Sequence, residues 1–141
     1  MTAPMQKVKF EPSIHTFHID FMNHVSNIVY VEWMEIGRCL LLEAAGMPVP
    51  QIMQQGYGPV LVETNIQYKQ QLKLGDTVRA EVWISEMNHV SAWMEFRFYG
   101  PDQTLAALGR QRGIFIDLQT GRPTRLPETD RQRFQPFIAE N

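Results

Sequence analysis

The fold of this chain is decided by residues 27–45, which read NIVYVEWMEIGRCLLLEAA. Apolar side chains recur there at helical spacing, and the stretch ends at Gly46 with Pro48 two residues later, a common way for a helix to stop. At about 100° per residue its charged side chains share one arc of roughly 140°, and the rest of the circumference is apolar. These charged residues are Glu32, Glu35, Arg38 and Glu43. Because a helix that is mostly apolar around its circumference is buried, we expect one long buried helix, capped by Ser26 or Asn27.

Around this helix the sequence changes to the alternation of apolar and polar residues that indicates half-buried strands. Residues 6–19 are expected to be extended, since Phe17 and Ile19 alternate with polar neighbours. After a loop over residues 48–58, four long strands are expected at residues 60–69, 78–85, 94–99 and 105–118. In the first of them Val60, Val62 and Thr64 should share one face. Short turns make these strands antiparallel neighbours.

One helix cannot cover both faces of such a sheet, so the strands must curl around it. We therefore predict an α+β protein, with a long antiparallel sheet wrapped around one central buried helix, in a single domain over residues 1–141. The sheet still has an edge and an outer face, where Trp83 and Trp93 are expected to lie. Self-association would cover both, so a homodimer or homotetramer is expected.

The composition fits one ordinary domain and argues against several classes of protein. The chain has 141 residues, of which 44% are hydrophobic and 20% charged. A net charge of −2 argues against a nucleic-acid partner, which usually leaves a basic excess. The charges inside residues 28–45 argue against a membrane span, and residues 1–10 lack the apolar run of a signal peptide. We therefore expect a cytoplasmic protein.

The sequence has no pattern typical of a metal site or a bound cofactor. Its single cysteine, Cys39, excludes an intramolecular disulfide and a cysteine-built zinc site. None of the histidines has ligand spacing with a cysteine or a paired carboxylate. No glycine-rich phosphate loop or dinucleotide fingerprint is present either. No metal and no cofactor are therefore expected.

The segment that leads into the helix, residues 20–30, reads DFMNHVSNIVY. It resembles the signature of hotdog-fold thioesterases of the 4-hydroxybenzoyl-CoA thioesterase type, which is Asp-x-x-Gly-His-Val-Asn-Asn-x-x-Tyr. The matching residues are Asp20, His24, Val25, Asn27 and Tyr30. Asn23 replaces the glycine and Ser26 replaces an asparagine, but asparagine adopts a positive φ with less strain than most residues. The resemblance continues at residues 56–61, 68–76 and 117–127, so it covers most of the chain.

The resemblance implies that Asp20 is the catalytic carboxylate of an acyl-thioester hydrolase. A carboxylate just before a helix lies near unpaired backbone N–H groups and the positive end of the helix dipole. Those donors could hold the thioester carbonyl and stabilise its oxyanion, while Asp20 attacks the carbonyl or activates a water. The substrate would be an acyl-CoA, or an acyl group on acyl-carrier protein, because plant acyl-carrier-protein thioesterases have a related turn.

The same resemblance gives a set of candidate substrate-binding residues, whose structural roles stay open. They are Asn23, His24, Asn27, Tyr30, Glu63 and Thr64. His24 could contact the substrate or hydrogen-bond the turn, and Tyr30 could line the acyl pocket or pack in the core. Glu63 and Thr64 come from the strand that faces the active site in relatives of this fold, sometimes across a dimer interface.

Other charged residues are also open to more than one interpretation. Glu35 could be an ion-pair partner for Arg38, face a dimer seam or take part in catalysis. The phosphates of CoA would need lysines or arginines, and arginines cluster late in the chain, although ordinary solvated charges are equally compatible. These are Arg110, Arg112, Arg122 and Arg125.

Two other functions compete with thioester hydrolysis. A hotdog-type hydratase or dehydratase of acyl thioesters would pair Asp and His in an Asp-x-Asn-Pro-Leu-His turn, but no Asn-Pro pair occurs in this chain. A non-catalytic acyl-binding protein could keep the fold without turnover.

Overall fold

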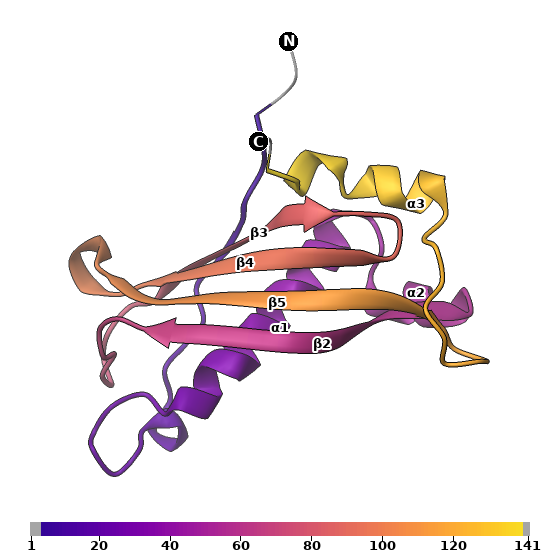
Figure 1. Ribbon diagram of the computed structural model, residues 1–141. Helices are drawn as coiled ribbons and strands as arrows, with labels where there is room; N and C mark the ends of the chain where they lie inside the picture. The colour runs from indigo at the N-terminus through magenta and orange to yellow at the C-terminus, as the bar shows by residue number, and fades with distance from the viewer. Residues whose placement is uncertain (1–3, 140–141) are drawn as a thin grey trace.

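A five-stranded antiparallel sheet curves around one long helix in the computed structural model, which describes residues 4–139 (Figure 1). The strands follow the spatial order β1-β3-β4-β5-β2. Their bounds are β1 Val8–Phe10, β2 Tyr57–Tyr68, β3 Arg79–Met87, β4 Ser91–Tyr99 and β5 Leu105–Asp117. The α-helices are α1 Asn27–Ala44, α2 Val49–Gln54 and α3 Glu128–Arg133, with 3₁₀ turns at Thr16–His18, Pro101–Gln103 and Gln135–Phe137. The predicted α+β architecture, a long antiparallel sheet around one central helix, is confirmed.

The concave face of the sheet packs on one side of α1. The ring centroids of Trp33 and Phe98 lie 5.9 Å apart, and Met34 and Phe96 are completely buried. A Cβ atom on Gly37 would lie 2.9 Å from the Phe10 ring. Only glycine therefore lets the helix and β1 approach this closely.

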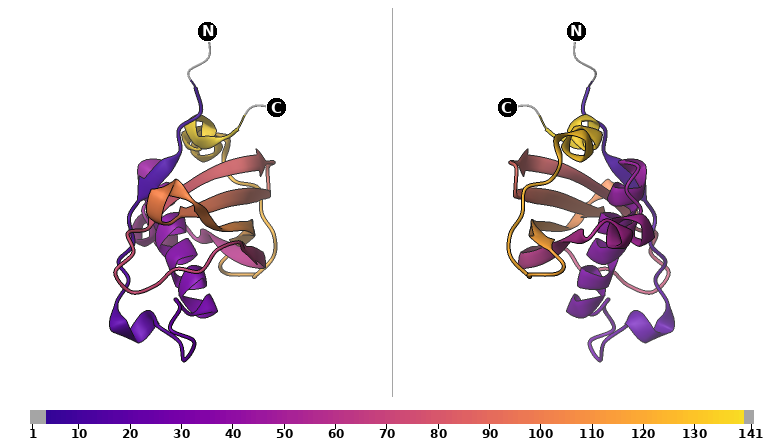
Figure 2. Two further views of the ribbon diagram at one scale, coloured as in Figure 1. Left: turned by 90° about the vertical axis from the view of Figure 1, so that its left-hand side faces the viewer. Right: turned by 90° about the vertical axis from the view of Figure 1, so that its right-hand side faces the viewer.

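The burial of α1 is one-sided, and its open side is the expected charged arc, on which apolar side chains are exposed as well. Ile28, Val31 and Ile36 are 68%, 44% and 47% exposed. Figure 2 shows the reason, because the single sheet curls around only part of the helix. These apolar side chains therefore stay open to solvent in the described part of the chain.

The strand order follows the sequence only in part. β3, β4 and β5 are consecutive antiparallel neighbours, as expected, but β2 pairs with β5 at the far edge and β1 takes the place beside β3. The segment between β2 and β3, residues 69–78, crosses under the sheet instead of forming a tight turn. It is anchored by Leu72, which is 1% exposed and whose carbonyl accepts the backbone N–H of Val25 at 2.8 Å.

Two segments outside the sheet differ from the sequence-based expectation. Residues 16–18 form a 3₁₀ turn with Phe17 77% exposed, so alternation over 15–19 did not mark a strand, and Ile19 makes only an isolated bridge to Val25. The expected loop over residues 48–58 contains α2, which begins after Pro48 with a second proline in its first turn.

A β-bulge between Leu61 and Glu63 decides which side chains of β2 face the helix. Leu61 pairs with Gly113 and Thr64 pairs with Gln111, so both lie on the concave face. Val60 consequently lies on the outer face, although unbroken alternation had placed it with Thr64.

Trp83 and Trp93 lie on the outer face of the sheet, as predicted, but neither is open. Lys7 Nζ lies 4.4 Å from the Trp83 ring centroid, and the Arg110 guanidinium lies 4.2 Å from that of Trp93. Glu95, which is 8% exposed, accepts a 2.8 Å ion-pair hydrogen bond from Arg110. Cations of the same chain therefore cover both indoles.

Within residues 4–139, no helix is long and apolar enough to cross a membrane.

Candidate active site

A tight turn connects the 3₁₀ turn to α1 and positions Asp20. The backbone N–H of Asp20 donates to the His24 carbonyl at 2.8 Å, and that of Asn23 donates to the Asp20 carbonyl at 3.0 Å. Asn23 adopts a φ of 67°, in the left-handed region that glycine and asparagine tolerate best. The positive φ expected of Asn23 is confirmed.

The Asp20 carboxylate is held by this turn through one of its two oxygens. Oδ1 accepts the backbone N–H of Met22 at 2.9 Å and that of His24 at 3.2 Å. Within residues 4–139 no hydrogen bond to Oδ2 is found, and the residue is half-buried. The carboxylate is therefore oriented by the backbone while one oxygen keeps its lone pairs for a water or a ligand.

The start of α1, seven residues after Asp20 in the chain, has no side-chain cap. Ser26 occupies the N-cap position but makes no capping hydrogen bond with its side chain. Asn27, the other expected cap, is the first residue of the helix and is exposed, so its side chain is in the wrong place to cap. The Val29 N–H donates to the Ser26 carbonyl at 3.0 Å, so within residues 4–139 the first-turn N–H groups that keep hydrogen-bonding capacity for a carbonyl or an oxyanion are those of Asn27 and Ile28.

Tyr30 belongs to the core and Tyr68 connects β2 to the start of the helix. Tyr30 is 2% exposed, and its ring packs edge-on against those of Trp33, Tyr68 and Phe98. Burial, with a smaller contribution from Tyr68, raises the pKa of Tyr30 to about 12, so its hydroxyl stays protonated near neutral pH. The Tyr68 hydroxyl donates to the Asn27 carbonyl at 3.2 Å. The alternation of residues along β2 could not predict this contact between Tyr68 and α1.

The two candidates from β2 lie apart from the Asp20 turn within one chain. Glu63 is exposed on the outer face, whereas Thr64 lies on the concave face and accepts a 3.3 Å hydrogen bond from Gln111 Nε2. Among the described residues, no hydrogen bond joins either side chain to Asp20. The structure thus brings Asp20, Asn23 and His24 together at the helix start and leaves Glu63 and Thr64 midway along β2.

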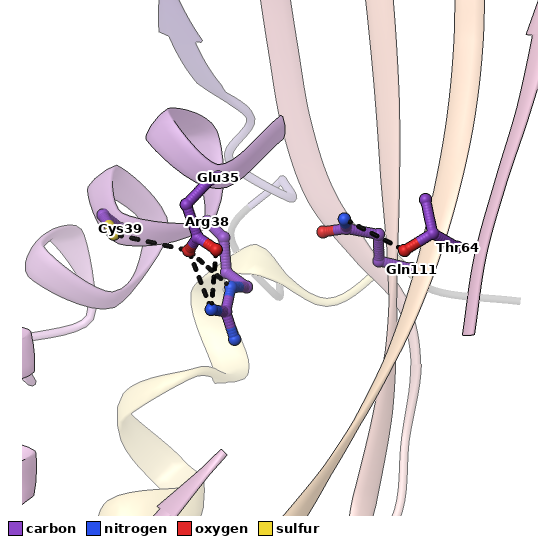
Figure 3. A network of polar contacts seen from close by, with 5 residues as sticks. All are labelled: Glu35, Arg38, Cys39, Thr64 and Gln111. Atoms are coloured by element: carbon purple, nitrogen blue, oxygen red, sulfur yellow. Dashed lines mark hydrogen bonds and ion pairs between the residues drawn. The ribbon is translucent and has the colours of Figure 1, made fainter. Parts of the chain in front are cut away.

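Other charged groups lie outside the Asp20 turn. Glu35 pairs with Arg38 at 2.7 Å on α1, which confirms one of the interpretations left open for Glu35 (Figure 3). Cys39 Sγ lies 3.7 Å from Glu35 Oε1, and burial followed by the nearby Glu35 charge raises the pKa of this thiol. Arg110 and Arg112 point from the outer face of β5, on the opposite side of the sheet from α1.

Comparison with known proteins gives a consistent result. A family model described as Thioesterase-like superfamily matches residues 14–135. "Putative acyl-CoA thioesterase YneP" of Bacillus subtilis (strain 168) is 27% identical over 119 residues, which cover 84% of this chain and 86% of that protein. "Acyl-acyl carrier protein thioesterase ATL3, chloroplastic" of Arabidopsis thaliana is 23% identical over 132 residues, or 93% of this chain and 69% of that protein.

The solved structures agree in fold. The protein SAV2348 from Staphylococcus aureus, solved in complex with CoA, matches with a TM-score of 0.89 at 18% identity, over 97% of this chain and 87% of that chain. The family model covers most of the chain, including the Asp20 turn, α1 and all four long strands. The chain therefore belongs to the thioesterase-like superfamily, which confirms the predicted hotdog fold and the predicted class of enzyme, a thioesterase.

Proposed function

We propose that this protein hydrolyses an acyl-CoA thioester with Asp20 as its catalytic carboxylate. The observation that carries the proposal is the Asp20 turn: one carboxylate oxygen is fixed by two backbone N–H groups, and the other is free of hydrogen bonds among residues 4–139. The uncapped first turn of α1 begins at Asn27, seven residues after Asp20. A carboxylate and a set of backbone donors are the two parts that this hydrolysis needs.

In the proposed reaction the first-turn amides of α1 hold the thioester carbonyl oxygen and stabilise the oxyanion that forms there. Asp20 Oδ2 either takes a proton from the attacking water or attacks the carbonyl carbon itself. The carbon–sulfur bond then breaks, and the electron pair leaves on the thiolate. Attack by water gives the free acid directly, whereas attack by Asp20 gives an acyl–Asp20 anhydride, which a water then hydrolyses to the free acid and the Asp20 carboxylate. A thiol has a pKa of about 8.5, so the thiolate leaves without a strong acid beside it.

The remaining candidates are given supporting roles. Asn23 shapes the turn through its positive φ, and the His24 backbone N–H holds Asp20, which leaves the His24 ring for the substrate. Asn27 forms the helix side of the site, and the buried Tyr30 packs behind it against Tyr68. Glu63 and Thr64 contact substrate only if another subunit brings a second site near β2.

The proposal also concerns the thiol that carries the acyl group, and it favours hydrolysis over the two competing functions. The similarity to an Arabidopsis acyl-acyl carrier protein thioesterase supports acyl-carrier protein as an alternative carrier. A hydratase would use an Asp-His pair, but the Asp20 carboxylate here bonds the His24 backbone, not its ring. A non-catalytic acyl-binding protein would have no use for a carboxylate oxygen held open at the helix start.

Release of free thiol from a panel of acyl-CoAs and acyl-carrier-protein thioesters tests the activity. We expect steady thiol release from at least one acyl-CoA, with no change in the ultraviolet absorbance of an enoyl-CoA double bond. Loss of that double bond without thiol release would make the protein a hydratase. Binding of acyl-CoA without either reaction would make it an acyl-binding protein.

We also propose that this one cytoplasmic domain forms a homodimer or homotetramer. Within residues 4–139 β2 is a long edge strand with only β5 beside it, and Val62 in its bulge is 48% exposed. An open edge of this length is usually covered by another chain. The 16.4 kDa chain is therefore expected to scatter light as a particle of two or four copies, and a monomer at micromolar concentration would contradict this.

A further inference from the structure

The turn that holds Asp20 presents two large apolar side chains to solvent. The hydrogen bond from the Asn23 N–H to the Asp20 carbonyl makes Phe21 and Met22 the two central residues of a β-turn. Their side chains are 96% and 60% exposed. The central positions of turns are usually occupied by glycine, proline, asparagine, aspartate or serine, which suit the backbone there. A phenylalanine followed by a methionine is therefore an exception that the geometry of the turn does not explain.

Other exposed apolar side chains lie beside this turn. Phe17 is exposed in the 3₁₀ turn just before it, and its ring stacks on that of His15 with centroids 5.2 Å apart. Leu74 is exposed in the segment between β2 and β3, which is joined to the end of the turn where the Leu72 carbonyl accepts the Val25 N–H. The four exposed residues are called the apolar tip: Phe17, Phe21, Met22 and Leu74.

The apolar tip projects from one end of the molecule. In Figure 1 the 3₁₀ turn and the Asp20 turn, drawn in purple, form the lowest part of the fold, below the start of α1 and on the opposite side from α3. Both views of Figure 2 again show these turns at the lower end. The two hydrogen bonds to Asp20 Oδ1, from the N–H groups of Met22 and His24, hold the Asp20 turn in shape. Its side chains can therefore be buried with little further loss of backbone freedom.

The charges beside the apolar tip suit an anionic lipid surface. Lys69 and Lys73 are exposed on the segment that carries Leu74. The acidic residues of residues 15–24 and 69–76 are Asp20 and Asp76, and each carboxylate accepts a backbone N–H of its own turn. Exposed lysines near a membrane are attracted by anionic headgroups. Bulky apolar side chains with cations beside them are the combination that interfacial membrane binding uses.

We propose that the apolar tip docks this protein on the surface of an anionic lipid bilayer, where Asp20 reaches the thioester of a membrane-bound long-chain acyl-CoA. The docking is independent of the proposed hydrolysis, whereas the choice of substrate rests on it. The long acyl chain of such a substrate is buried among the lipid chains while the charged CoA stays in water, so the thioester lies at the interface. Phe21 is the residue next to Asp20, and its insertion brings the carboxylate to that level.

Two other occupants fit this surface less well. An acidic protein such as acyl-carrier protein would be recognised by a cluster of cations, but Lys69 and Lys73 are the only lysines or arginines of residues 15–24 and 69–76. A second copy of this chain seated on the tip would also cover Asp20, whose Oδ2 the proposed reaction leaves open for the substrate. A bilayer takes up projecting apolar side chains without needing a complementary shape.

Sedimentation of the full chain with lipid vesicles tests the docking. Vesicles of phosphatidylglycerol and phosphatidylcholine are compared with vesicles of phosphatidylcholine alone. Phe21→Ser should lower the partition coefficient on the mixed vesicles by about tenfold or more, the value of one aromatic side chain taken out of water. Lys73→Gln should lower it about fivefold, on the mixed vesicles only. Met53→Ser is the matched control, because Met53 is 67% exposed on α2, past the other end of α1, and should leave binding unchanged.

Hydrolysis in the presence of the same vesicles tests the choice of substrate. The wild type should cleave palmitoyl-CoA bound to mixed vesicles, and Phe21→Ser should lower this rate about tenfold at limiting vesicle concentration, as it lowers binding. The rate on hexanoyl-CoA, which stays dissolved in water, should not change, because the Phe21 side chain makes none of the hydrogen bonds that hold Asp20. If no acyl-CoA is cleaved, the choice of substrate fails with the proposed hydrolysis, and sedimentation still decides the docking.

Three results would overturn the docking. Wild-type protein that stays in the supernatant with both kinds of vesicle does not bind bilayers. Equal binding of the wild type and Phe21→Ser would mean that another surface meets the lipid. If the wild type ignores vesicles and Phe21→Ser instead lowers the particle size in light scattering, the tip is a contact with a second copy. If the same substitution abolishes binding of acyl-carrier protein, the tip is a contact with that carrier.

Discussion

Asp20→Asn is expected to lower kcat for acyl-CoA hydrolysis by about 10²–10⁴-fold, the usual contribution of a positioned general base. The asparagine side chain keeps an oxygen that can accept the N–H groups of Met22 and His24, so the turn should survive. It loses the charge and the basic lone pair that the proposed reaction uses at Oδ2. Substrate binding should change little, so KM should stay within a few-fold. Thiol release under saturating acyl-CoA measures the effect.

Asp117→Asn is a closely matched control for this variant. Asp117 is also half-buried, and its Oδ1 also accepts two backbone N–H groups, from Gln119 at 2.8 Å and Thr120 at 3.0 Å. It ends β5, outside the Asp20 turn, so its substitution should leave kcat unchanged. If Asp20→Asn keeps full activity, hydrolysis can stand but Asp20 has no catalytic role. Label in Asp20 after a single turnover in ¹⁸O-labelled water would identify Asp20 as the nucleophile, because label enters the carboxylate only when water opens an acyl–Asp20 anhydride at the Asp20 carbonyl.

Phe96→Ala is expected to cost about 3–5 kcal/mol of folding free energy, the range for truncating a buried aromatic residue. Phe96 is completely buried on β4, and its ring stacks on that of Phe98 with centroids 6.5 Å apart. The ring also faces the Gly37 backbone, where α1 approaches most closely. The cavity left by truncation would lie between helix and sheet, which cannot collapse without moving α1. Urea unfolding at fixed protein concentration measures the loss.

Phe21→Ala is the matched control for Phe96→Ala. Phe21 lies in the turn before α1 and is 96% exposed, so the same truncation there should change the unfolding free energy by less than about 0.5 kcal/mol. Equal losses in the two variants would mean that the core between α1 and β4 does not dominate stability. Because an oligomer is expected, both variants should be compared at the same subunit concentration.

The sequence was informative wherever a feature depends on neighbouring residues. Helical spacing over residues 27–45 predicted α1 to within one residue at its C-terminus, because i, i+3 and i, i+4 contacts are local. Alternation predicted the four long strands for the same reason. The steric tolerance of asparagine predicted the positive φ at Asn23. The strand predicted at residues 15–19 was wrong, because an alternation of five residues is too short to distinguish a strand from a 3₁₀ turn.

The candidate site could be predicted only in its local part. The motif from Asp20 to Tyr30 is contiguous, so the sequence could place the carboxylate before the helix. The motif did not predict the hydrogen bonds that hold Asp20 Oδ1. It also did not predict that the N-cap of α1 lacks a side-chain hydrogen bond, because Ser26 is a good capping residue by type and still makes none. The burial of Gln111 could not be predicted either, since a glutamine on an alternating strand gives no sign of burial.

By itself, the sequence determined the elements, the thioesterase signature and the carboxylate in front of the helix, because each depends on the spacing of residues close together in the chain. Tertiary structure alone decided that β2 lies at the far edge beside β5, that a bulge turns Leu61 and Thr64 toward α1, and that only one side of α1 is covered. It also brought Thr64 and Gln111, 47 residues apart, into one hydrogen bond. Such contacts depend on which strand edges meet and how the sheet curls, and no local period encodes either.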